Sequence, residues 1–238
     1  MKTISTCATA AVLAFGISQA QAYVIQGSDF INNQHSQEFN GNATFEARSF
    51  DSPGDVGYFM KKSQAGHTGV GVAGGRTSGE LDLNEAIIGN FSSQMLFDSF
   101  TLGLLFDGPE YGDVNEVARV SIFDGSSWLM GTLTAIGSLE ATWTFGGSST
   151  SVTALSPSTD GQGAVWKVEN PFGTTLGSRI ALGAQQGVCG KAGGACNNQS
   201  DYTLNQISYS AVPEPSSIAL LAIGMIGLGI TRSRSKKA

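Results

Sequence analysis

Apolar and polar residues alternate along most of the middle of the chain, which is the pattern of strands with one buried face. The segment 116–123, EVARVSIF, is the clearest example, because Ala118, Val120 and Ile122 fall on one face of an extended chain. The best helical candidate is short and covers 83–91, although this segment could instead be strand and loop. Segments of strand length are predicted at 43–50, 97–106, 116–123, 128–136, 139–145, 164–170, 179–184 and 202–210.

Turn-forming residues separate these segments, as in DSPGD, DGPEYGD and SPSTDGQG. Many short strands joined by glycine-rich turns are typical of two packed antiparallel sheets. We therefore predict an all-β body with the architecture of a β-sandwich of jelly-roll type. No repeat of fixed period is visible in the sequence, which disfavours propellers and solenoids.

The first 22 residues have the three parts of a secretory signal peptide. Lys2 supplies the positive charge, 8–17 forms an apolar run, and Ala20-Gln21-Ala22 provides small residues at the cleavage positions. We expect signal peptidase to cut after Ala22, so that the exported protein begins at Tyr23.

The chain ends in an apolar run followed by a basic terminus. Residues 218–230 are apolar or glycine, and with 216, 217 and 231 the run spans about 24 Å as a helix, slightly less than a bilayer core of about 30 Å. Positive charges resist translocation, so the basic residues act as a membrane stop signal on the cytoplasmic side. These residues are Arg232, Arg234, Lys236 and Lys237. We predict a single membrane helix here, and three regions: signal peptide 1–22, β body 23–211 and C-terminal segment 212–238.

The C-terminal stretch VPEPSSIALLAIGMIGLGI, followed by TRSRSKK, resembles the PEP-CTERM sorting signal of Gram-negative bacteria. The resemblance implies that Pro213, Glu214 and Pro215 are recognised by an exosortase, a membrane-embedded cysteine transpeptidase that cuts near this motif. Two prolines keep the segment out of a helix, as a protease substrate requires. The resemblance also implies transit through the inner membrane to the cell surface, outer membrane or extracellular matrix, in association with exopolysaccharide and biofilm systems.

The charge distribution disfavours a nucleic-acid partner. The whole chain carries a net charge of −6, but 23–212 holds 18 acidic and 8 basic residues, a balance of −10. A body this acidic repels phosphate backbones.

The exported body keeps two cysteines, Cys189 and Cys196. Six residues separate them, three of which are glycine, so the loop closes easily. In an oxidising compartment we expect a disulfide, which would contribute about 2–3 kcal/mol.

Two sequence features raise the question of a bound group. Asp107, Glu110 and Asp113 supply oxygen ligands suited to a structural calcium ion, but the same composition fits a solvated acidic turn. GVGVAG at 69–74 has the spacing of a dinucleotide loop, yet the GRTSGELDL that follows does not read as a helix. We therefore expect no cofactor, with structural calcium left as an alternative.

The sequence gives little support for catalysis. His35 and His67 are the only histidines, and neither a G-x-S-x-G elbow nor an H-E-x-x-H zinc motif occurs. We therefore predict a non-enzymatic surface or matrix protein. A carbohydrate-binding or ice-binding module is the alternative, and a secreted hydrolase is less favoured. Tryptophans that stack on sugar rings would support the alternative, although on strands they are more often core residues. The three candidates are Trp128, Trp143 and Trp166.

Overall fold

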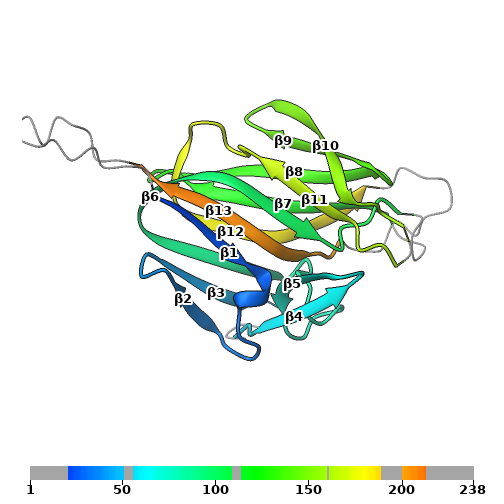
Figure 1. Cartoon of the computed structure of the whole chain (residues 1–238), viewed down its shortest axis with the longest axis horizontal. Coiled ribbons are helices and arrows are strands. Elements are labelled where there is room, and N and C mark those ends of the chain that lie inside the picture. The colour runs from blue at the N-terminus through cyan, green and yellow to red at the C-terminus, as the bar shows by residue number, and fades with distance from the viewer. Residues whose placement is uncertain (1–20, 51–55, 109–113, 160, 189–199, 213–238) are drawn as a thin grey trace, which may run out of the picture. The chain divides into compact units, whose positions relative to one another are not determined.

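The computed structural model describes residues 21–50, 56–108, 114–159, 161–188 and 200–212, which belong to one compact unit of antiparallel strands (Figure 1). A single 3-10 turn, η1 (Gly27–Asp29), interrupts the strands in this described part of the chain. The strands are β1 (Ala22–Gln26), β2 (Ser36–Phe39), β3 (Ala43–Ser49), β4 (Phe59–Gln64), β5 (His67–Val72), β6 (Glu85–Gly103), β7 (Asn115–Phe123), β8 (Trp128–Gly137), β9 (Glu140–Phe145), β10 (Ser148–Ser156), β11 (Val165–Glu169), β12 (Leu176–Val188) and β13 (Thr203–Ala211).

The 19-residue strand β6 organises the fold, because it pairs with different strands along its length. On one edge it pairs first with β12 and then with β11, and on the other edge first with β3 and then with β13. From β12 the order continues through β7, β8, β9 and β10 to β11, which returns to β6. Seven strands therefore close into a barrel.

The remaining strands extend the sheet from the outer edge of β6. β13 continues it to β5 and β4, β1 also pairs with β13, and β2 pairs with β3. Register places Ala22 opposite Ser210, so the first and last described strands run side by side (Figure 1).

The structure confirms the all-β class but not the predicted jelly-roll sandwich. In a sandwich, two sheets pack face to face without joining. Here β6 is long enough to pair with β12 at Ile87–Leu96 and with β11 at Ser99–Leu102, which joins both into one hydrogen-bonded ring. The alternation of apolar residues predicts which face of a strand is buried, but not which edges pair, and the predicted sandwich is corrected to a barrel with added strands.

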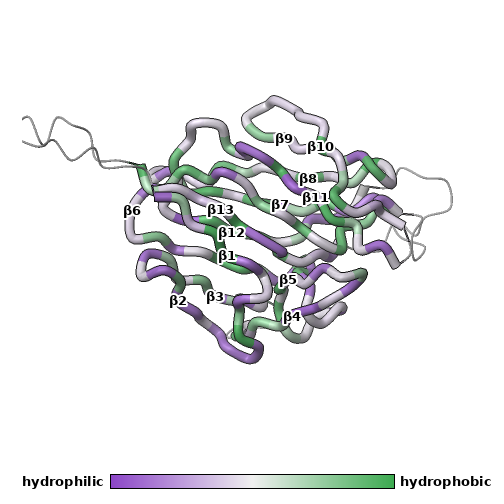
Figure 2. The backbone as a smooth tube through the Cα atoms, in the orientation of Figure 1, coloured by the Kyte–Doolittle hydropathy of each residue, from purple (hydrophilic) through white to green (hydrophobic). Residues whose placement is uncertain are grey.

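The core is one continuous apolar cluster that draws on the ring and on the added strands. Ring strands contribute residues such as Phe100, Leu133 and Trp166, and the added strands contribute Phe45 and Tyr209. Hydrophobic and hydrophilic positions alternate along many strands, whereas much of the β9–β10 hairpin is pale (Figure 2). The β9–β10 hairpin is rich in serine, threonine and glycine.

The segments predicted as strands all overlap observed strands, and the helical candidate 83–91 is instead the start of β6. Within the described ranges no helix is long and apolar enough to cross a membrane. The predicted membrane helix and the signal peptide up to residue 20 lie outside those ranges, as do Cys189 and Cys196 of the predicted disulfide.

Gly131 on β8 gives a stability prediction. A Cβ atom at this position would lie 2.3 Å from the Cη2 and Cζ2 ring atoms of Trp143, so it would clash with the indole. We expect Gly131→Ala to displace the indole and lower the free energy of unfolding by about 1–3 kcal/mol, measured by urea denaturation. Gly137→Ala, on the same strand with nothing within 4 Å of its Cβ position, serves as the control. Equal stability of both variants would contradict the packing of Trp143 on Gly131.

Candidate functional site

Most of the sequence-predicted sorting and processing residues lie outside the described ranges. This holds for Ala20 and for the sorting and stop residues Pro213, Glu214, Pro215, Arg232, Arg234, Lys236 and Lys237. Ala22, the other residue of the predicted cleavage site, is the first residue of β1.

The acidic turn proposed for calcium is described only in part, because Glu110 and Asp113 lie outside the described ranges. Asp107 is buried, and its Oδ1 accepts a hydrogen bond of 2.9 Å from the hydroxyl of Ser158. The same hydroxyl accepts a bond of 2.8 Å from the backbone N–H of Asp107. Among the described residues no group of three or more acidic, histidine or cysteine side chains is arranged to hold a metal ion.

The tryptophans considered for sugar stacking have different environments. Trp143 and Trp166 are buried, and their indole N–H groups donate to the backbone oxygens of Pro171 and Leu105, both at 2.7 Å. Trp128 is 42% exposed, and the Arg179 guanidinium lies 5.1 Å from its ring centre. Two of the three indoles are therefore core residues.

The histidines and the glycine motif have structural contacts. His35 Nδ1 lies 2.9 Å from the backbone oxygen of Gly57, and His67 lies on β5. Gly69 and Gly71 of the GVGVAG motif are also on β5, where a Cβ atom would lie within about 2.5 Å of Thr203 and of the Glu80 backbone, respectively. The motif is therefore part of a closely packed strand rather than a loop that opens a helix.

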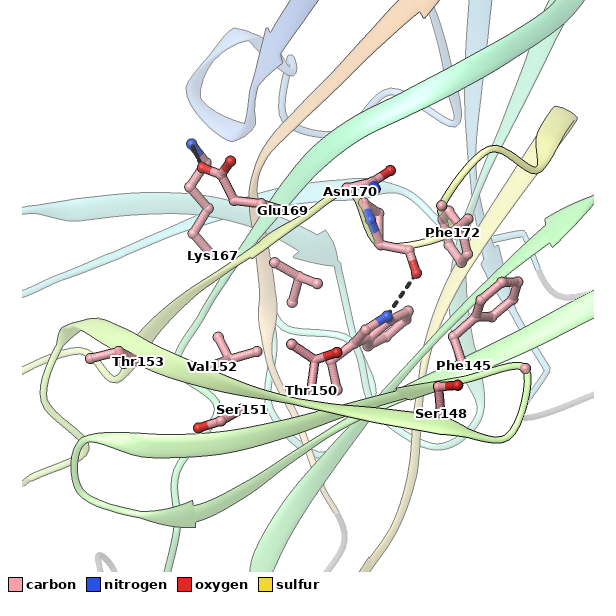
Figure 3. A pocket seen from close by; sticks show the side chains of 15 residues that line it. Phe145, Ser148, Thr150, Ser151, Val152, Thr153, Lys167, Glu169, Asn170 and Phe172 are labelled. Carbon is pink, nitrogen blue, oxygen red and sulfur yellow. Dashed lines mark hydrogen bonds and ion pairs between the residues drawn. The ribbon is translucent and has the colours of Figure 1, made fainter.

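A recess lies between β10 and β11, and we call it the seam cleft (Figure 3). Its volume of about 520 Å³ is within the range of about 300–1,000 Å³ that is usual for ligand sites. Trp143, Phe145 and Phe172 contribute aromatic lining, with Phe145 and Phe172 ring centres 5.0 Å apart. Thr150 and Val152 point toward the cleft, while Ser151 points away from it (Figure 3).

The seam cleft exists because β10 and β11 separate after a short contact. They pair at Ala154↔Trp166 and Ser156↔Val165, with a register irregularity between these pairs. No further pairing between them occurs in the described residues, although β9 and β10 stay paired to the end of their hairpin. An ion pair of 2.6 Å between Lys167 and Glu169 leaves the β11 wall without net charge.

The outer surface of β8, β9 and β10 carries an ordered set of hydroxyl groups, which we call the hydroxyl face. In one row Thr132 lies opposite Thr144, and Thr144 opposite Ser149; in the next, Thr134, Thr142 and Ser151 are matched in the same way. Neighbouring strands are about 4.8 Å apart, and residues on one face repeat about every 6.8 Å along a strand. Six hydroxyl residues therefore form an array of two rows, and none of the six is buried.

A group of carboxyl side chains is buried at the other side of the molecule, around the start of β6. Glu80, Asp82 and Glu85 are each at most 3% exposed. Asp82 Oδ2 accepts a 3.0 Å hydrogen bond from the backbone N–H of Thr77 and a second hydrogen bond from the backbone N–H of Arg76. Glu85 Oε2 accepts one of 3.1 Å from the N–H of Asp82. These contacts fix the loop that leads from β5 into β6.

Burial raises the pKa values of two of these carboxyl groups. For Glu80 the pKa rises to about 9, mainly by desolvation and further by a hydrogen bond with Asp201, while Lys62, 2.5 Å away, acts in the opposite direction. Burial also raises the pKa of Asp82, against the backbone N–H groups of Thr77 and Arg76. The raised pKa favours the protonated form of Glu80, whose carboxyl can then donate a hydrogen bond to Asp201.

The last strand of the β body, β13, ends at Ala211, directly before the C-terminal segment that contains the Pro-Glu-Pro motif. The PEP-CTERM protein-sorting motif matches residues 211–234, so the chain carries this motif, as the sequence resemblance predicted. The motif supports exosortase-dependent sorting of an exported protein that crosses a membrane to the cell surface. No curated protein and no solved structure matches the chain.

Sequence reasoning missed both the hydroxyl face and the seam cleft. Strand β10 was not predicted, because its SSTSVTALS sequence resembles a turn. A usable signal was present, since TLT at 132–134, TWT at 142–144 and STS at 149–151 place hydroxyl residues at alternate positions of consecutive segments. Alternate positions share one face of a strand.

The buried Glu80 carboxyl predicts a pH dependence of stability. Its pKa is raised from 4.5 to about 9 on folding, so the folded protein binds the extra proton between these values. Stability is therefore highest below about pH 4.5 as far as this group is concerned, and it falls as pH rises toward 9. We expect Glu80→Gln to remove about one proton from the pH dependence of unfolding between pH 5 and 9.

Urea denaturation at several pH values measures this change in slope. Glu140→Gln, at the exposed start of β9, is the matched control and should retain the wild-type slope. An unchanged slope in Glu80→Gln would mean that Glu80 is ionised in the folded protein.

Proposed function

We infer that this protein is a non-enzymatic component of the cell surface or extracellular matrix of a Gram-negative bacterium. An exosortase processes it at the C-terminal motif, and it associates with exopolysaccharide in a biofilm. The sorting motif supports the export route, and the hydroxyl face is the observation that supports the polysaccharide association.

The hydroxyl face suits an uncharged, extended polysaccharide for two reasons. Its six side chains both donate and accept hydrogen bonds, as sugar hydroxyls do. Thr144 and Ser149 are already 3.0 Å apart at their hydroxyl oxygens, so this pair is held in place before any partner binds. The strongly acidic body disfavours polyanionic chains, because like charges repel.

The polysaccharide association is tested with the central strand of the hydroxyl face. Thr142→Val and Thr144→Val together keep the side-chain shape and β-propensity but remove two hydroxyls. At about 0.5–1.5 kcal/mol for each hydrogen bond, we expect roughly tenfold weaker binding to the exopolysaccharide of the producing cells, measured by affinity electrophoresis.

Thr44→Val with Thr68→Val, on β3 and β5, is the matched control. If both double variants bind like the wild type, the hydroxyl face is not the polysaccharide site. Inhibition of ice recrystallisation that is lost only in the Thr142/Thr144 variant would instead assign this array to ice.

The sorting route is tested at the motif itself. Replacing Pro213, Glu214 and Pro215 by alanine lets a helix continue through the segment, since proline is the residue that prevents it. We expect membrane insertion to persist while processing stops, so that the full-length chain stays in the inner membrane of exosortase-containing cells. Fractionation and immunoblotting measure this outcome. A variant that is cut and delivered normally would reduce the tail to a simple anchor.

A further inference from the structure

The seam cleft is bordered by two strand edges whose backbone groups face it. The β9–β10 hairpin turns at Gly146 and Gly147, which both have positive φ, so Phe145 and Ser148 form its closing hydrogen-bonded pair. Bonded pairs alternate with non-bonded ones, and the bond from the N–H of Ala154 to the oxygen of Leu139 follows the same alternation. The backbone N–H and C=O of Ser151 therefore point away from β9, toward β11.

The opposite edge has the matching orientation. The N–H of Asn170 donates to the oxygen of Asp98 at 2.7 Å, which makes Val168↔Phe100 another bonded pair of β11 and β6. The backbone groups of Glu169 consequently point away from β6, toward β10. Continued from Ala154↔Trp166, the register would pair Ser151 with Glu169, but the strands have already separated there.

We propose that the seam cleft binds an extended peptide segment of a partner protein, which adds a strand between β10 and β11. Open strand edges are the usual template for such an addition, because main-chain hydrogen bonds supply affinity and alternate side chains enter pockets. Val152 and Phe172 are buried side chains that line the cleft, so its floor is apolar.

The lining favours a peptide over a sugar as the occupant. A sugar ring stacks on an exposed aromatic face, but Trp143 is 4% and Phe172 2% exposed, so their faces are covered. The third aromatic residue, Phe145, is partly buried and packs edge-to-face against Phe172. Besides polar side chains such as Thr150, the cleft is bordered by main-chain donors and acceptors of β10 and β11.

Charge further restricts which peptides would bind, because the Lys167–Glu169 pair is neutral and the body carries an excess of ten negative charges. The peptide is therefore uncharged or basic.

Backbone recognition is tested with a pair of substitutions at one position. Ser151→Pro removes the N–H that faces the cleft without removing a bond to β9, whereas Ser151→Ala removes only the hydroxyl. The probe is a fluorescent, end-capped heptapeptide of alternating threonine and valine with one lysine, titrated by anisotropy against the processed protein from the producing cells. We expect at least tenfold weaker binding to Ser151→Pro and wild-type binding, within twofold, to Ser151→Ala.

A change in the probe tests the same point without altering the protein. The heptapeptide N-methylated at every second residue cannot pair as a strand, and it should lose binding to the wild type. Replacing its lysine by glutamate should weaken binding as well. Equal binding of the N-methylated peptide, no binding at millimolar peptide, or displacement of the peptide by a neutral oligosaccharide would overturn the proposal. None of these outcomes bears on the hydroxyl face, which Thr142 and Thr144 test separately.

Discussion

The length of β6 is the constraint on which the rest of this structure depends. A strand of average length has one partner on each edge, but 19 residues give β6 room for two on each. β12 and β11 share one edge of β6, and β7, β8, β9 and β10 pair in succession from β12 to β11, so these seven strands close into a barrel. The other edge holds β3 and β13, so the same strand also anchors the added sheet.

Neighbouring strands of the barrel are paired over long stretches at some places and over short stretches at others. β7 and β12 are in register from Arg179↔Phe123 to Gln185↔Val117, whereas β10 and β11 join only near Ala154 and Ser156 within the described residues. At the open part of the seam, buried aromatic side chains fill the barrel in place of backbone pairing. Trp143 reaches this position because Gly131 on the neighbouring strand leaves room for its ring.

The sequence predicted what depends on local pattern and missed what depends on partners far along the chain. Alternation located the strands around Ala118–Ile122 and their buried faces, and the terminal motif was recognised from its three ordered parts. The segment 83–91 was ambiguous because its apolar run lacks strict alternation, and only pairing with β3 and β12 makes it a strand. The buried state of Glu80 was invisible for the same reason, since Lys62 and Asp201 come from other elements.

Strand β10 brings the two candidate surfaces together and explains why they can be separated experimentally. A strand presents side chains on its two faces and backbone groups along its edges, so one residue can serve two surfaces that do not overlap. Ser151 does so: its hydroxyl belongs to the outer array, and its N–H and C=O face the seam cleft. A change in the side chain alone therefore acts on the hydroxyl face, and a change in the backbone donor alone acts on the seam. The proposed polysaccharide association and the proposed strand addition therefore depend on different groups of the same strand.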